Sequence, residues 1–77
     1  RMYMQRWALV TMNHRGRIDD GKDFWINESN VASMMELDDG CMVNFATSEY
    51  DVIKVRQSCD CIFTEWDNWQ ATQEGSD

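Results

Sequence analysis

Apolar residues occur in short runs along the 77-residue chain, and their spacing predicts several strands followed by one helix. Residues 7–12, 24–26 and 50–57 are rich in aromatic and β-branched residues, which favour strands. For the last of these runs, one long helix starting at Glu49 is the alternative. We predict a strand there, because Tyr, Val and Ile dominate the run.

An Asp-Asp-Gly sequence at residues 38–40 lies between two further apolar segments and is typical of a hairpin turn. A two-residue loop at 39–40 would mix polar and apolar residues on both faces of the hairpin. A three-residue loop at 38–40 pairs Met35 with Val43 and leaves one apolar face. We therefore predict the three-residue loop, with Gly40 at a positive φ that glycine adopts without steric cost.

After residue 58 the apolar positions change to the spacing of a helix. They recur at intervals of three and four, at Cys59, Ile62, Phe63, Trp66 and Trp69. Ser58 precedes them and is a favoured N-cap residue, and we expect the helix to end near Gln70.

These elements predict an α+β fold, in which four to five short antiparallel strands form a sheet or a small open barrel. One C-terminal helix packs on the strands. We expect residues 1–70 to form a single compact domain and residues 71–77 to form a flexible acidic tail.

The charge of the chain is strongly negative and unevenly distributed. Fourteen acidic residues stand against seven basic ones, which gives a net charge of -7. All fourteen follow Ile18, and only Lys22, Lys54 and Arg56 oppose them there. This balance argues against direct binding of nucleic acid, which depends on Lys and Arg. No apolar run reaches the ~20 residues of a membrane span, so we expect a cytoplasmic protein that does not contact membranes.

The cysteines and the single histidine give little support to metal binding or catalysis. An odd count, Cys41, Cys59 and Cys61, excludes complete internal pairing, so we expect reduced thiols. A zinc site with His14 is disfavoured, because Cys59 and Cys61 have only one residue between them and structural zinc sites usually have C-x₂₋₄-C spacing. A helix would also place Cys59 and Cys61 about 200° apart. We therefore predict no enzyme, no metal and no cofactor.

Four tryptophans are more than one small core can bury, so Trp25 or Trp69 should be partly exposed. An exposed aromatic residue among acids is typical of a protein interface. The candidate partner-binding residues are Trp25, Asp38, Asp39, Asp60, Glu65, Asp67 and Trp69. We predict a non-catalytic acidic module that binds a protein with a basic surface, for example a small phage-type inhibitor that covers a nucleic-acid-binding groove. A homodimer is left open.

Part of the pattern resembles a known family. Phe-Trp-Ile-Asn at residues 24–27, then Val31, the acidic Gly hairpin and Val-Ile-Lys-Val-Arg-Gln-Ser at 52–58 are similar to the small flagellar FlbD-type proteins. Gln57 departs from the Glu that is usual in that family. The resemblance implies the same strand-and-helix order and an alternative function as an accessory component of a bacterial assembly such as the flagellum. It implies no catalytic residue.

Overall fold

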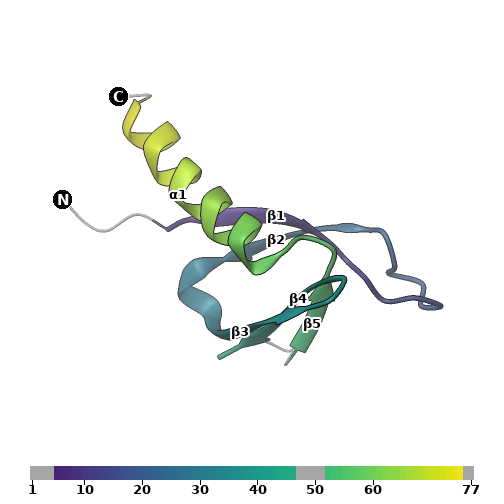
Figure 1. Cartoon of the computed structure of the whole chain (residues 1–77). Coiled ribbons are helices and arrows are strands. Elements are labelled where there is room, and N and C mark those ends of the chain that lie inside the picture. The colour runs from purple at the N-terminus through teal and green to yellow at the C-terminus, as the bar shows by residue number, and fades with distance from the viewer. Residues whose placement is uncertain (1–4, 47–51, 76–77) are drawn as a thin grey trace.

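The computed structural model describes residues 5–46 and 52–75, with side chains up to Trp69, and confirms the α+β fold (Figure 1). Its elements are β1 (Trp7–Thr11), β2 (Asp23–Asn27), the 3₁₀ turn η1 (Glu28–Asn30), β3 (Val31–Leu37), β4 (Gly40–Phe45), β5 (Val52–Val55) and α1 (Cys59–Gly75). The strands form two antiparallel sheets, β1-β2 and β3-β4-β5. The described strands do not close into a barrel. No helix in the described ranges has the length and apolarity needed to cross a membrane.

The two sheets are joined where the end of β1 meets β5. Met12 and Val55 form an antiparallel bridge between the sheets. Arg56 N donates to the Thr11 carbonyl at 2.8 Å, and Thr11 N donates to the side-chain oxygen of Gln57 at 2.8 Å. These bonds satisfy the backbone of β1 on the side that faces away from β2. They place β1 between β2 and β5.

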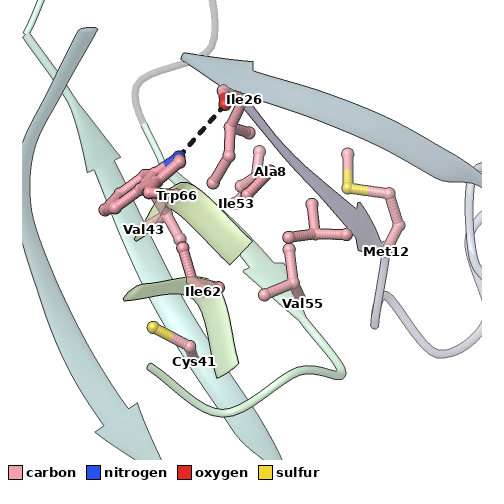
Figure 2. Close-up of a cluster of buried hydrophobic side chains, with 10 residues drawn as sticks. Ala8, Met12, Ile26, Cys41, Val43, Ile53, Val55, Ile62 and Trp66 are labelled. Carbon is pink, nitrogen blue, oxygen red and sulfur yellow. Dashed lines mark hydrogen bonds between the residues drawn. The ribbon is translucent and has the colours of Figure 1, made fainter. Parts of the chain in front are cut away.

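The core lies between the sheets and α1 (Figure 2). Alternate residues of the strands supply most of it, as the two-residue period of a strand requires. The buried apolar residues are Ala8, Val10, Met12, Ile26, Cys41, Val43, Ile53, Val55, Ile62 and Trp66. The Trp66 indole N–H donates to the Ile26 carbonyl at 3.4 Å, which orients the largest core side chain against β2.

The predicted strand and the predicted helix start are confirmed between residues 52 and 61. Residues 52–55 form β5, and Ile53 and Val55 are buried on one face as their alternation indicates. Ser58 is the N-cap, since its hydroxyl accepts a hydrogen bond from Cys61 N at 3.1 Å. The predicted end of the helix at Gln70 is wrong, because α1 continues to Gly75.

The predicted register of the hairpin is also wrong. Met35 lies opposite Met42, not Val43, and Met34 lies opposite Val43. The pairing of Leu37 with Gly40 leaves residues 38–39 as a two-residue loop.

The observed register places Glu36 on the same face as Cys41, toward the N-terminus of α1. There the Glu36 carboxylate accepts a hydrogen bond from Cys59 N at 3.0 Å. Free N–H groups at a helix N-terminus favour a negative charge. Glu36 remains exposed to water, and its helix partner is not apparent from the hairpin sequence alone.

Gly40 has the predicted positive φ, at 153°, although it begins β4 instead of closing the loop. A Cβ atom at this position would overlap the Val55 carbonyl oxygen of the adjacent strand. Both the backbone conformation and the close approach of β5 therefore require glycine.

Gly40→Val should consequently lower the free energy of unfolding by about 2 kcal/mol or more. Gly16→Val is the matched control, because Gly16 has a positive φ of 83° but open space around it. Urea unfolding of both variants should find Gly40→Val the less stable. Equal losses would show that contact with β5 is not what requires glycine at residue 40.

The expectation of reduced cysteines is wrong for two of the three. Cys41, at the start of β4, forms a disulfide with Cys59, the first residue of α1. Their Cα atoms lie 5.3 Å apart, which is within the usual range for a disulfide. An odd count excludes complete pairing but permits one pair, and the fold brings this pair together. Cys61 remains a free thiol exposed on α1.

Candidate partner-binding surface

The outward side of α1 carries three of the predicted partner-binding residues. Asp60, Glu65 and Asp67 are all exposed, as predicted, because Ile62 and Trp66 turn inward to the core. Asp60 and Asp67 are seven residues apart and so lie on nearly the same side of the helix. Glu65 lies on another part of the exposed surface. The helix thus presents carboxylates on more than one side.

Asp67 has a counter-charge from a residue far away in the sequence, Arg6. Arg6 forms two hydrogen bonds with the Glu28 carboxylate, at 2.6 and 2.7 Å, and a third with Asp67 at 2.9 Å. The hydrogen bonds from Arg6 lower the pKa of Glu28 and raise that of Arg6. This ion-paired group ties the start of β1 and η1 to α1.

Phe63 lies between Asp60 and Asp67 along the helix and is 51% exposed. The helical spacing predicts Phe63 among the inward apolar residues, and that part of the prediction is wrong. Its ring contacts the buried Trp66 edge to face, with centroids 5.7 Å apart. The contact supports one side of the ring and leaves the rest accessible. The result is an exposed aromatic ring with a carboxylate one turn away on either side.

Trp25 and Trp69 come together although they are 44 positions apart in the sequence. Their rings pack edge to face with centroids 6.0 Å apart, and Trp25 is 52% exposed. This confirms that one of the two is partly exposed. The pair forms a second aromatic feature beside α1, and aromatic rings of this kind often act as interface anchors.

We define the acidic helix surface as α1 from Cys59 to Trp69, the two charged residues bonded to it, Arg6 and Glu36, and Glu28, which pairs with Arg6. Its described charged residues are Arg6, Glu28, Glu36, Asp60, Glu65 and Asp67. Five carboxylates therefore accompany one guanidinium group. The surface keeps a net negative charge even after the Arg6 ion pairs are counted.

The other two predicted residues, Asp38 and Asp39, are exposed in the hairpin loop and do not join this surface. They line a separate groove of about 950 Å³ whose other walls are β5 and the connection between β1 and β2. No residue of α1 lines that groove. Five of the seven predicted residues therefore gather on or beside α1.

His14 lies in the wall of the groove with both ring nitrogens engaged. The Lys54 backbone N–H donates to Nε2 at 3.1 Å, so the proton resides on Nδ1, which donates to Asp19 at 3.2 Å. The imidazole thus takes the place of a strand carbonyl beside β5. It is not placed to act as a general base, because its accepting nitrogen is occupied.

The residues considered for zinc are not brought together. Two of the three thiols form the Cys41–Cys59 disulfide, and His14 lies in the groove wall, away from Cys61 on α1. Within residues 5–46 and 52–75, no three potential metal ligands form a group.

Comparison with known proteins gives no match to a family model, a curated protein or a solved structure. The similarity to FlbD-type proteins stays a prediction based on the sequence pattern.

Proposed function

We propose that this protein is a non-catalytic binding module whose acidic helix surface engages a protein with a basic surface. The observation that carries the proposal is Phe63, half exposed between Asp60 and Asp67 on a surface with five carboxylates and one guanidinium. The carboxylates would attract and orient a basic partner, and the ring would supply apolar contact area. The occupied ring nitrogens of His14 support a non-catalytic role.

The most specific form of the proposal is a small inhibitor, of the type that phages encode, which covers the nucleic-acid-binding groove of its target. Such a groove is built from Lys and Arg side chains that contact phosphates. Carboxylates fixed on a rigid helix can occupy the same positions with less loss of conformational freedom than a flexible acidic chain. The partner is thus a basic protein, and the module does not bind nucleic acid itself.

The proposed place of action is the cytoplasm, where nucleic-acid-binding proteins of bacteria work. Thiols are kept reduced in that compartment. The acidic helix surface must therefore remain folded when the Cys41–Cys59 disulfide is open. Binding should accordingly be measured both with and without a dithiol reductant.

The test is a capture experiment with the immobilised protein and bacterial extract, followed by elution with duplex DNA. Proteins that use one groove for DNA and for this module should be released by the DNA. Captured proteins that DNA does not release would contradict the inhibitor form of the proposal. Failure to retain any basic protein at low salt would contradict the proposed function itself.

Charge reversal on α1 should weaken the capture. Asp60→Lys combined with Glu65→Lys changes two exposed carboxylates that form no ion pair with the described residues, so stability should change by less than about 1 kcal/mol. Retention of the partner should fall sharply at low salt, mainly through a slower association rate, and the difference should shrink at high salt.

The matched control is Asp38→Lys with Asp39→Lys, which makes the same change of charge in the hairpin loop. Surface plasmon resonance with a captured, purified partner should find normal association for the control. If both double variants weaken association equally, net charge and not the acidic helix surface governs binding.

A further inference from the structure

The groove beside β5 has walls of opposite charge that do not neutralise each other. Arg15, Arg17 and Lys54 contribute cations, with Asp19 beside them, while Asp38 and Asp39 contribute carboxylates from the hairpin loop. Among the described residues, neither Asp38 nor Asp39 has an ion pair with these cations. On the basic wall, Arg17 has Asp19 3.8 Å away on the same connection, whereas Arg15 and Lys54 form no ion pair with the described residues. The charges left without a partner on the two walls are therefore opposite in sign, and an occupant that itself carries both signs can neutralise both walls.

An apolar side chain projects from the connection that forms the basic wall. Ile18 is 93% exposed. The connection between β1 and β2, to which it belongs, extends away from the C-terminal end of α1 (Figure 1). The connection is not loose, since Arg17 N donates to the His14 carbonyl at 2.9 Å and His14 N donates to Asp20 at 3.0 Å. Ile18 is therefore exposed to water on a connection whose backbone is fixed by hydrogen bonds.

The groove offers apolar surface that an isoleucine side chain would cover. Leu37 lies at the hairpin side of the groove, and Val52 lies on β5 with 45% of its surface exposed. Removing apolar surface from water favours association. Ile18 belongs to the same connection as Arg15 and Arg17, which line the groove together with Leu37 and Val52.

From these features we propose that the occupant is a second copy of this chain, related by a two-fold axis. In such a pair each contact occurs twice, so the basic wall of one copy faces the acidic hairpin loop of the other, and the reverse. Ile18 of each copy covers Leu37 and Val52 of its partner copy. The proposal does not depend on the proposed function, because the groove and the acidic helix surface share no residue.

Sedimentation equilibrium of the whole chain, from about 1 μM to 1 mM, tests the dimer. The wild-type chain should dimerise in this range, and Ile18→Asp should raise the dimer dissociation constant at least about tenfold. Arg15→Glu should have a comparable effect. Lys22→Glu is its matched control, because it makes the same charge change on the same connection outside the groove. A monomeric wild-type chain at all concentrations would overturn the proposal.

Two charge-reversed variants give the decisive result. Arg15→Glu with Arg17→Glu makes both walls acidic, and Asp38→Lys with Asp39→Lys makes both walls basic, so neither variant should dimerise alone. An equimolar mixture restores both pairs of opposite charges and should form a heterodimer. The two-fold arrangement would be overturned if either variant alone formed homodimers. It would also be overturned if the mixture stayed monomeric while both variants kept the wild-type circular dichroism spectrum. Asp60→Lys with Glu65→Lys should leave dimerisation unchanged and separates this interface from the acidic helix surface.

Discussion

Trp66→Ala should lower the free energy of unfolding by about 3–5 kcal/mol, the usual loss when a buried tryptophan is truncated. Trp66 is 2% exposed and is the largest fully buried side chain of the described core. It joins α1 to β2 by its apolar contacts and by its hydrogen bond to the Ile26 carbonyl. Small domains are stable by only about 5–15 kcal/mol in total. We therefore expect the variant to be largely unfolded at 37 °C.

Two further variants separate the contributions of Trp66. Phe63→Ala removes a neighbouring aromatic ring from the same helix, but that ring is half exposed, so the loss should be about 1 kcal/mol. Trp66→Phe keeps most of the buried volume and removes the indole N–H, which should cost about 1–3 kcal/mol. Thermal unfolding followed by circular dichroism should rank Trp66→Ala as the least stable. If Phe63→Ala unfolds at the same temperature as Trp66→Ala, the inward side of α1 has been assigned wrongly.

Local signals in the sequence were sufficient where the structure depends on near neighbours along the chain. The Ser58 cap and the spacing of Ile62 and Trp66 specify the start of α1, because a helix repeats every 3.6 residues and an N-cap acts within one turn. The alternation of Ile53 and Val55 likewise identifies β5. These features needed no knowledge of the rest of the fold.

The hairpin register could not be predicted, because the hairpin packs against residues far along the chain. Counting apolar residues favours an inner face with Met35 and Leu37. The observed inner face includes Glu36, whose carboxylate accepts the Cys59 N–H of α1. Glu36 remains exposed to water, and the helix N–H gives its carboxylate a favourable partner. That partner is known only once the helix has been placed.

The candidate site was predicted in its parts but not in its arrangement. The exposure of Asp60, Glu65 and Asp67 follows from helix periodicity. The Arg6 bridge to Asp67 spans 61 positions, and the contact of Trp25 with Trp69 depends on how α1 crosses β2. Long-range contacts of this kind have no signature in a single sequence, since charge and aromaticity do not specify partners.

Replacing the disulfide by Cys41→Ala with Cys59→Ala should lower the free energy of unfolding by about 3 kcal/mol. The bond joins residues 18 positions apart and so restricts the unfolded chain, which in the loop-entropy model stabilises the fold by that amount. For a domain of this size the melting temperature should fall by roughly 15 °C. Differential scanning calorimetry measures both quantities.

The reductant supplies the control for that measurement. Wild-type protein in excess dithiothreitol should melt close to the double variant, and the double variant should not respond to dithiothreitol. Cys61→Ser should melt like the wild type in both conditions, because Cys61 is exposed and takes no part in the bond. Free thiols in the reduced sample are verified by titration. If dithiothreitol then leaves the wild-type melting temperature unchanged, a stabilising role for the bond is contradicted. The reduced chain is expected to melt lower but still to capture its basic partner through Asp60 and Glu65. In that case burial of Ile62 and Trp66 is what mainly keeps the acidic helix surface folded. The module can then act in a reducing compartment.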